Sequence, residues 1–425
     1  MQWRRLAAVV LALAFCARAL PASAPQGRAY WVGSWATSQQ IPEPNNALAS
    51  DDLRDATLRQ IVHLSIGGKL LRVHISNAFG DAPLRLTSVH IARPVGAASP
   101  QIDPATDRAL TFSGRLEVSI PAGGEYISDP IAFAAAPQSN LAITFHVDEP
   151  PKGETGHPGS RATSFLVHGD HVAGADLANA MKFDHWFNIG GVDVNAPPDA
   201  AAIVALGDSI TDGHASTTNG NDRWTDDLAR RLLAARATKP ARALGVLNEG
   251  IGGNRLLLDG LGPNALARFD RDVLAQAGVR YLIVMEGIND IGTFGLQGAL
   301  QGGQQGEQPQ SAHDALVQSI IGAYEQIVLR AHAHGIRVFG ATLTPFVGSG
   351  YYKPGPLNEA DRQAVNRWIR TPGHFDAVID FDKAIRDPQR PEQMLPAYDS
   401  GDHLHPSPAG YRAMAAAIPL AYFAR

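Results

Sequence analysis

Two short segments of the chain carry the residue types that an acyl-transfer reaction requires. In the first, Gly207–Ser209, a serine follows an apolar run, which predicts that the Ser209 hydroxyl lies at the carboxyl end of a buried strand. In the second, Asp402 and His405 are three residues apart. One tight turn can bring this carboxylate to an imidazole nitrogen and fix its tautomer, which leaves the other nitrogen free to take the Ser209 proton. The spacing therefore predicts a nucleophile, a general base and an acid that orients the base.

Further segments supply candidate donors for an oxyanion, which an acyl-transfer site must stabilise. The turn after the first strand can present backbone N–H groups, including that of Ser209, to an anion. Gly253 follows a second apolar run and can offer a backbone N–H, and its lack of a side chain lets a substrate approach closely. Gly252 stays open as the alternative donor, because Gly250–Gly253 holds three glycines. Asn289, after a third apolar run, can offer a neutral side-chain amide.

Other glycine-rich motifs do not fit Gly207–Gly213. No lysine follows the glycines, so the segment is not a phosphate-binding loop, and Thr211 stands where the G-x-S-x-G motif needs its second glycine. A lone Gly-Asp-Ser is a weak signal, since a serine after a strand is usually only a helix cap. We expect Asp208 and Asp290 to hold their turns through hydrogen bonds to the backbone.

Metal and thiol chemistry are not expected. His403 and His405, with Asp399 and Asp402 nearby, resemble a metal pair, but no clear motif supplies the remaining ligands. The single cysteine, Cys16, lies in an N-terminal segment that we expect to be removed, which leaves no thiolate for a metal site or a cysteine hydrolase. We therefore expect neither a metal nor another cofactor. The net charge of −5 gives no reason to expect nucleic acid as a partner, because phosphate binding needs clustered Lys and Arg.

The second half of the chain alternates between two kinds of segment. Apolar runs occur at Ala202–Leu206, Gly245–Asn248, Tyr281–Met285, Arg337–Ala341 and Ala377–Phe381, and helical patterns at Arg223–Ala235, Asn264–Gln276, Ala312–His334, Asn358–Ile369 and Pro408–Phe423. This alternation predicts an α/β fold with a parallel sheet covered on both faces. Ligands of such sheets bind beyond the carboxyl ends of the strands, which is where most of the candidate residues are predicted.

The pattern in the first half of the chain predicts an all-β sandwich or jelly roll. Short β-prone runs occur at Gln60–Ile66, Lys69–Ser76, Leu84–Ala92, Arg115–Ile120 and Leu141–Val147. Gly67-Gly68, between two such runs, predicts a tight hairpin turn. The chain of 425 residues is long enough for two domains, which we place at residues 30–195 and 200–425 on either side of the linker Asn195–Asp199.

Residues 1–24 have the features of a secretory signal peptide. Arg4 and Arg5 give a positive start, the apolar run Leu6–Phe15 follows, and Ala-Ser-Ala ending at Ala24 gives a small-x-small cleavage site. The apolar run is too short to span a bilayer, and no long amphipathic or basic stretch supports membrane docking. We expect cleavage after Ala24 and a secreted or periplasmic protein without stable membrane association.

Four motifs follow one another along the chain: Gly207–Ser209, Gly250–Gly253, Asn289, and Asp402 with His405. In this order they resemble the sequence blocks of the SGNH subgroup of GDSL esterases and lipases over about residues 200–425. The residues that match the family name are Ser209, Gly253, Asn289 and His405, with Asp402 completing the Asp-x-x-His pair. The resemblance implies a flavodoxin-like three-layer hydrolase domain. The opening Trp31–Ala36 and the β-rich half also resemble secreted members that carry an N-terminal accessory β-domain.

The resemblance implies a serine esterase acting on a small-molecule or polysaccharide ester, and family analogy favours short acyl groups such as acetyl on carbohydrates. A lipase or phospholipase and a non-catalytic carbohydrate-binding protein are the alternatives. Gly292–Ser311, rich in Gly and Gln, is either a mobile loop beside the site or a solvated insertion without a role.

Overall fold

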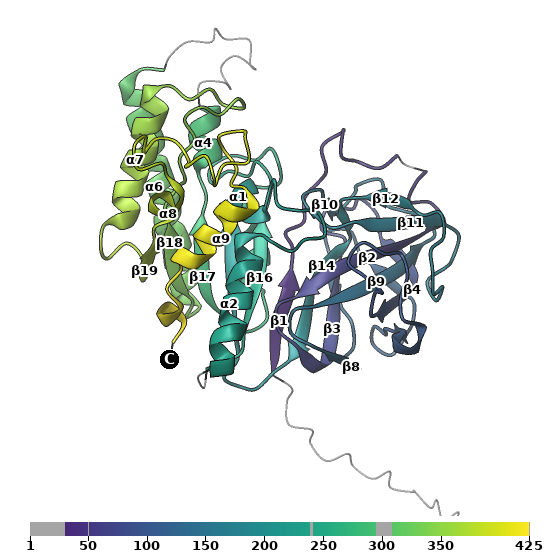
Figure 1. Cartoon of the computed structure of the whole chain (residues 1–425). Helices are drawn as coiled ribbons and strands as arrows, with labels where there is room; N and C mark the ends of the chain where they lie inside the picture. The colour runs from purple at the N-terminus through teal and green to yellow at the C-terminus, as the bar shows by residue number, and fades with distance from the viewer. Residues whose placement is uncertain (1–29, 50, 239–240, 295–307, 425) are drawn as a thin grey trace, which may run out of the picture.

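The computed structural model of the chain describes residues 30–49, 51–238, 241–294 and 308–424. A β-rich region precedes an α/β region, and the two lie side by side (Figure 1). The predicted signal peptide at residues 1–24 lies outside the described residues. So does most of the predicted loop Gly292–Ser311, the two ends of which belong to helices.

The β-rich region consists of two antiparallel sheets and a short strand pair. The first sheet holds β1 (Trp31–Ala36), β14 (Ile189–Asn195), β3 (Gly68–Ser76) and β7 (Glu125–Ile127) in this order, with β8 (Ile131–Ala135) also on β3. The second holds β12 (Met181–Phe183), β11 (Ser164–His168), β2 (Ala56–Leu64), β9 (Ser139–Val147), β4 (Leu84–Ala92) and β5 (Arg108–Ala109), with β6 (Val118–Ile120) also on β4. Strands β10 (Gly156–His157) and β13 (Trp186–Phe187) form the pair, and a 3-10 turn lies at Pro104–Thr106. The predicted all-β class of this half is confirmed.

The predicted hairpin at Gly67-Gly68 is wrong. Strand β2 pairs with β9 and β11, whereas β3 pairs with β14, β7 and β8, so the glycines join two different sheets. The chain before them follows β1, where the Ser65 N–H donates to the carbonyl oxygen of Ser34. A Cβ atom at Gly67 would lie 2.3 Å from the carbonyl oxygen of Ala135. Glycine is therefore needed here for a close backbone approach between segments, a use of glycine that resembles a turn signal in the sequence.

The α/β region is built on a parallel sheet of five strands. Their order is β16 (Leu244–Gly250), β15 (Ala201–Gly207), β17 (Val279–Met285), β18 (Arg337–Ala341) and β19 (Ala377–Ile379), with β15 pairing both β16 and β17. In chain order this is 2-1-3-4-5, the flavodoxin-like arrangement, in which ligands bind where the order reverses, at the carboxyl ends of the first and third strands. The predicted α/β class with a parallel sheet is confirmed, and the reversal lies between β15 and β17.

Helices cover both faces of this sheet (Figure 1). One group comprises α2 (Trp224–Thr238), α8 (Phe381–Ile385) and α9 (Pro408–Ala417), followed by a 3-10 turn at Leu420–Phe423. The other comprises α3 (Ala265–Phe269), α6 (Gln310–Ala333) and α7 (Pro356–Arg370), while the short helices α1 (Ser209–Asp212) and α4 (Ile288–Thr293) follow β15 and β17. The helix predicted at Asn264–Gln276 is α3 followed by a π-helical turn, Asp270–Leu274. Within the described ranges, no helix has the length and apolar character needed to cross a membrane.

Strand β1 joins the two regions, because it pairs with β14 and packs beside β16 of the α/β region (Figure 1). Two hydrogen bonds cross the junction: the Gly33 N–H donates to the Ala277 carbonyl at 2.9 Å, and the Val246 N–H donates to Oγ of Ser65 at 3.0 Å. Buried residues of both regions belong to one continuous apolar core. This shared core does not define a boundary between two units, so the division into residues 30–195 and 200–425 stays a proposal.

Candidate active site

The structure brings Ser209, His405 and Asp402 together. Ser209 is the first residue of α1, directly after the carboxyl end of β15, and its Oγ lies 2.8 Å from Nε2 of His405. Nδ1 of His405 lies 2.6 Å from Oδ2 of Asp402. Both Ser209 and His405 are buried, with 6% and 4% of their surface exposed. A hydroxyl, an imidazole and a carboxylate that are hydrogen-bonded in this order can activate an oxygen nucleophile.

Asp402 fixes the orientation of the histidine. Its Oδ1 accepts the backbone N–H groups of Leu404 at 2.9 Å and His405 at 2.8 Å, which leaves Oδ2 for the imidazole. Burial alone would raise the pKa of Asp402, but these hydrogen bonds from His405 and Leu404 hold the pKa well below its usual range. The carboxylate is therefore ionised and accepts the Nδ1–H of His405, so Nε2 faces Ser209 as an acceptor.

Gly252 and Gly253 line the same pocket as Ser209 and His405. Gly253 has φ +71°, and a Cβ atom there would lie 2.2 Å from Cδ1 of Leu261, so a side chain is excluded by backbone conformation and by space. Neither glycine N–H has an acceptor among the described residues. Both are thus available to an oxyanion, and the two stay equally open as its donor.

Asn289 lies in the first turn of α4, beyond the end of β17, and only 1% of its surface is exposed. Its Nδ2 donates to the carbonyl oxygen of Asn254 at 2.7 Å, and its Oδ1 accepts the Tyr352 hydroxyl at 2.5 Å. Tyr352 lines the pocket at Ser209, whereas Asn289 lies behind it and is not itself part of the pocket lining. Since β15 and β17 are neighbours, with Gly207 opposite Met285, the turns that carry Ser209 and Asn289 are adjacent.

Asp208 holds its own turn as predicted, whereas the hydrogen bonds of the Asp290 carboxylate go to the backbone of the loop after β16. Oδ1 of Asp208 accepts the Ile210 N–H at 2.9 Å, which caps α1, and the Asp290 carboxylate accepts the N–H groups of Leu256 and Leu257 at 2.8 and 3.0 Å. Burial raises the pKa of Asp208 to about 7 and that of Asp290 to about 6. Burial thus disfavours the charged form of both carboxyl groups.

Arg268 on α3 ties the site's loops together, and sequence reasoning missed it. Its guanidinium donates to the Gly207 carbonyl at 2.9 Å, below the turn of the nucleophile, and to Oδ1 of Asn254 at 3.0 Å. It also forms a buried ion pair with Asp272 at 2.9 Å. An arginine on an amphipathic helix usually faces water, and nothing in the spacing of Arg268 marks it as buried.

His214 packs against His405, with 4.0 Å between the ring centres. Its Nδ1 accepts an N–H of Arg161 at 2.8 Å, and Arg161 belongs to the β-rich region. Burial, together with the charges of His405 and Arg161, lowers the pKa of His214 to about 4, so its ring is neutral near pH 7. Sequence reasoning missed both residues, which are 53 positions apart.

Among the described residues, one group of three side chains has the spacing to hold a metal ion. His214, Asp402 and His405 each offer a ligand atom, and these atoms lie within 4.8 Å of one another. The neighbouring guanidinium of Arg161 opposes a cation there. His403 and His405, which were not expected to act as a metal pair, have different partners: Nδ1 of His403 lies 2.5 Å from Asp399, while His405 faces Ser209 and Asp402.

Three pockets of the described residues lie along the junction of the regions, and one of them, of about 260 Å³, is lined by Gly67 and Lys69 on the β-rich side and by Leu232 and Leu244 on the other. The one at Ser209 has a volume of about 480 Å³, and its β-rich wall consists of Gln40, Glu43, Asn45, Asn46, Pro158, Gly159 and Arg161. Leu261, Tyr351 and Leu404 add apolar surface. The β-rich region therefore forms one side of the pocket without contributing to the Ser209, His405 and Asp402 set.

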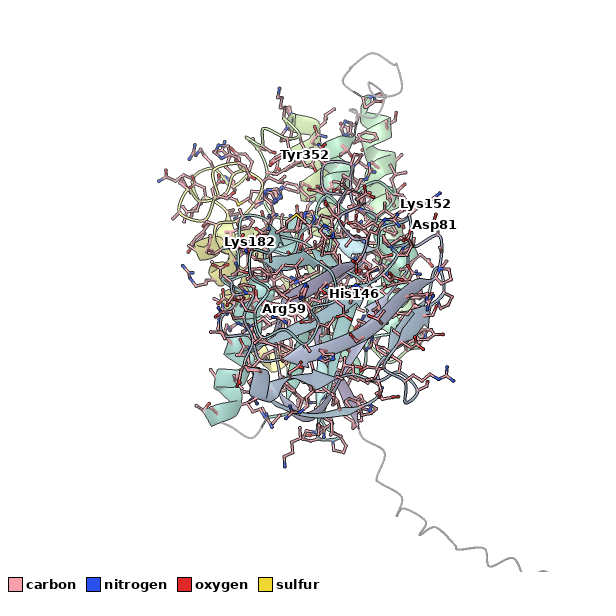
Figure 2. The ribbon with its side chains drawn as sticks, turned by 90° about the vertical axis from the view of Figure 1, so that its right-hand side faces the viewer. Arg59, Asp81, His146, Lys152, Lys182 and Tyr352 are labelled. Carbon is pink, nitrogen blue, oxygen red and sulfur yellow. The ribbon has the colours of Figure 1, made fainter. Side chains whose placement is uncertain are left out.

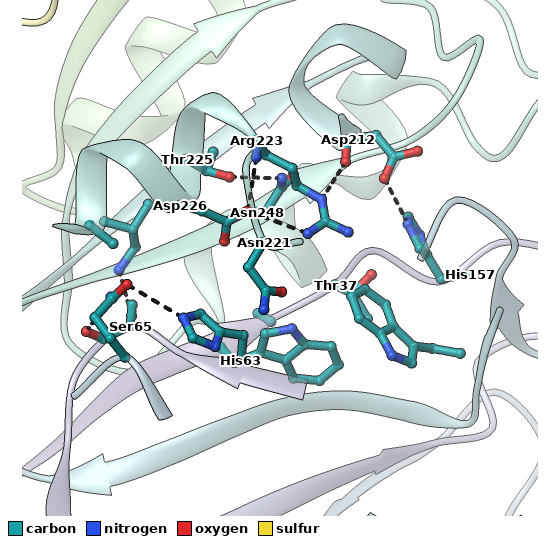
Figure 3. A pocket seen from close by; sticks show the side chains of 16 residues that line it. Thr37, His63, Ser65, His157, Asp212, Asn221, Arg223, Thr225, Asp226 and Asn248 are labelled. Carbon is teal, nitrogen blue, oxygen red and sulfur yellow. Dashed lines mark hydrogen bonds and ion pairs between the residues drawn. The ribbon is translucent and has the colours of Figure 1, made fainter. Parts of the chain in front are cut away.

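A smaller pocket, of about 40 Å³, lies beside Asp212, which lines both this pocket and the one at Ser209 (Figure 3). Its polar side chains bond one another: His157 to Asp212, Arg223 to the Asp212 carbonyl, and Asn248 to Thr225 (Figure 3). A cavity of this size holds a few waters at most. The pocket at Ser209 is the candidate active site, because the hydrogen-bonded pair of Ser209 and His405 lines it.

Comparison with known proteins gives a match over residues 203–418, just over half of the chain, to the family model described as GDSL-like Lipase/Acylhydrolase. Structurally similar proteins include an acetylxylan esterase from Geobacillus stearothermophilus, solved as a catalytic mutant, with 21% identity and a TM-score of 0.37 over 51% of this chain and 91% of that one. A GDSL-like lipase from Bacteroides thetaiotaomicron VPI-5482 has 17% identity and a TM-score of 0.33, covering 51% and 84%. The aryl esterase of M. smegmatis has 15% identity and a TM-score of 0.36, covering 51% and 95%. A search of curated protein sequences found no match.

Proposed function

The chain belongs to the GDSL-like lipase/acylhydrolase family, and we propose that it is a secreted serine esterase that hydrolyses carboxylic esters through an acyl-Ser209 intermediate. The observation that carries the proposal is the line of hydrogen bonds from Ser209 Oγ to His405 Nε2, at 2.8 Å, and from His405 Nδ1 to Asp402, at 2.6 Å. Membership of a hydrolase family leaves the non-catalytic carbohydrate-binding interpretation without support.

In the first half of the reaction, Oγ of Ser209 attacks the ester carbonyl carbon while Nε2 of His405 takes the hydroxyl proton. The ionised Asp402 stabilises the imidazolium that forms. The imidazolium then gives its proton to the departing alcohol. A water molecule, activated in the same way, attacks the acyl-serine and releases the acid.

Negative charge develops on the carbonyl oxygen of the ester when Ser209 attacks it and again when water attacks the acyl-serine. We assign its stabilisation to the backbone N–H of Ser209, the side-chain amide of Asn289 and the N–H of Gly253, with Gly252 as the alternative. Burial supports this assignment, because hydrogen bonds to an oxyanion are stronger where water is excluded.

We propose a short acyl group, such as acetyl, on a hydrophilic alcohol such as a carbohydrate. Glu43, Asn46 and Arg161 make the β-rich wall of the pocket polar, and burying a long alkyl chain against such groups costs their desolvation. The lipase alternative is favoured by a different observation, the exposed apolar side chains of Leu261 and Tyr351 at the pocket.

A panel of p-nitrophenyl esters from acetate to palmitate, together with an acetylated xylo-oligosaccharide, distinguishes the short-acyl proposal from the lipase alternative. We expect kcat/KM to fall steadily with acyl length and acetate to be released from the sugar. A kcat/KM that rises toward the long chains would instead support the lipase. The Ser209→Ala variant, measured in parallel, gives the background rate.

Secretion is the remaining part of the proposal, and its support is the sequence of residues 1–24. Expression of the full chain in a bacterium with a secretory pathway, followed by mass determination of the exported protein, tests it. We expect a new N-terminus at Pro25. An exported or retained protein that keeps residues 1–24 would contradict this part alone.

A further inference from the structure

The side-chain amide of Asn289 can serve an oxyanion only in one of its two orientations. The oxygen and nitrogen ends of a primary amide have nearly the same size, but one accepts hydrogen bonds and the other donates them. A flipped amide would present its oxygen to the developing negative charge and repel it. Whatever fixes the amide orientation therefore controls the contribution of Asn289 to catalysis.

Two neighbours fix this orientation. The carbonyl oxygen of Asn254 can only accept, so the amide end that lies 2.7 Å away must be the NH₂ group. The oxygen end consequently faces the hydroxyl of Tyr352 at 2.5 Å, and the tyrosine must be the donor. One amide hydrogen of Asn289 is used by Asn254, which leaves the second for a substrate.

The fold makes room for this tyrosine. Tyr352 lies in the loop after β18, where the Lys353 N–H donates to the Ser349 carbonyl at 2.9 Å. Its ring packs against Gly292 in the last turn of α4, and a Cβ atom at Gly292 would lie 2.4 Å from Cδ2 of the ring. Glycine at this position thus permits the ring to reach across α4 to Asn289.

The hydroxyl stays a donor over the whole working range of an esterase, because burial raises the pKa of Tyr352 above its ordinary value. In Figure 2, Tyr352 lies near the top of the molecule, above Arg59 and His146 of the β-rich region.

We propose that Tyr352 is a positioning residue of the oxyanion hole, whose hydroxyl donates to Oδ1 of Asn289 and so turns the Asn289 N–H toward the oxygen of the bound ester. The inference rests on the proposed function, which makes Asn289 an oxyanion donor. Tyr352 acts through Asn289 and contributes no proton to the reaction.

A double-mutant cycle on the mature full-length chain tests this inference. The variants are Tyr352→Phe, Asn289→Ala and the double variant, with kcat and KM for p-nitrophenyl acetate and the melting temperature measured for each. Phenylalanine keeps the ring that packs on Gly292 and removes only the hydroxyl. The control is Tyr126→Phe, which removes the hydroxyl of an exposed tyrosine on β7 and is expected to leave kcat unchanged.

We expect Tyr352→Phe to lower kcat about ten-fold, with KM within two-fold of wild type, because one neutral hydrogen bond that orients the amide is lost. In the Asn289→Ala background the same change should have no further effect on kcat.

Three outcomes would overturn the inference: an unchanged kcat in Tyr352→Phe, an effect confined to KM, or an equal drop in kcat in both backgrounds. An unaltered kcat in Asn289→Ala would overturn the oxyanion role of Asn289 itself and this inference with it. Ser209 labelling would still test the proposed nucleophile separately.

Discussion

Nε2 of His157 lies 3.0 Å from Oδ1 of Asp212, so a side chain of the β-rich region is bonded to the short helix that begins with Ser209. A second buried contact crosses the junction at Ser38, whose hydroxyl lies 2.8 Å from both Glu249 and Asp272. The Ser38 hydroxyl has one proton to donate, and its oxygen accepts an N–H of Arg268 at 2.7 Å. Burial, with the nearby charge of Asp272, raises the pKa of Glu249 well above its usual value.

Residues 196–425 produced alone should therefore lose at least 90% of the activity toward p-nitrophenyl acetate. The fragment lacks His157 and Ser38, and buried carboxyl groups that lose their partners destabilise the site. The measurement is kcat and melting temperature against the chain of residues 25–425, with co-expressed residues 25–195 as the restoring control. A fragment with unchanged kcat and stability would show that the β-rich region is only an appendage.

Replacing Asp402 with Asn should lower kcat by on the order of a thousand- to ten-thousand-fold while the fold is retained. The amide oxygen would keep the two backbone hydrogen bonds that Oδ1 now accepts, which turns the NH₂ toward His405. Nδ1 would then have to accept, the proton would move to Nε2, and the imidazole could no longer take the Ser209 proton. Steady-state kinetics and thermal melting of Asp402→Asn check this. Near-normal kcat would mean that another group orients the histidine.

The pH dependence of stability should report on His74 in the β-rich region. Burial alone would lower the pKa of His74, but hydrogen bonds to Asp193 and Glu125, at 3.0 Å each, outweigh it and raise the pKa to about 9. Because the folded pKa exceeds the unfolded value of about 6.5, this stabilisation is fully present below pH 6.5 and is lost as pH rises through 9. Its size is on the order of 3 kcal/mol.

The melting temperature of wild type should accordingly fall between pH 7 and 10 more steeply than that of His74→Gln. The exposed His168→Gln is the matched control and should follow wild type. If the melting temperatures of wild type and His74→Gln changed with pH in parallel, the raised pKa of His74 would be contradicted.

Prolonged dialysis against EDTA should leave kcat/KM unchanged. A serine, a histidine, a carboxylate and oxyanion donors supply the nucleophile, the base and the charge stabilisation of ester hydrolysis by themselves. Loss of activity on chelation that zinc restores would instead point to the cluster of His214, Asp402 and His405 as a metal site.

The parts of the fold and site that the sequence predicted are those coded by neighbouring residues. The apolar run before Ser209 forms strand β15 because its residues are buried on both faces of the sheet, as those of parallel strands are. Asp402 and His405 meet because a three-residue spacing closes one turn. The helix start at Asp208 is a local capping pattern as well.

The parts that could not be predicted depend on pairs far apart in the chain. Tyr352 and Asn289 are separated by 63 positions, and Arg161 and His214 by 53. No local period marks such pairs, because the contact exists only once the strands have been arranged. Gly67 misled the prediction for a related reason, since a glycine that admits a neighbouring backbone is indistinguishable in sequence from one that makes a turn.

The identity of the nucleophile is the central claim, and covalent labelling tests it most directly. The mature chain is treated with diisopropyl fluorophosphate, and the modified peptide is located by mass spectrometry. The account predicts one adduct, on Ser209, that forms in step with the loss of esterase activity. It also predicts no adduct and a fall in kcat on the order of a million-fold in Ser209→Ala. Stoichiometric labelling of a different serine, or a Ser209→Ala variant that still turns over, would contradict it.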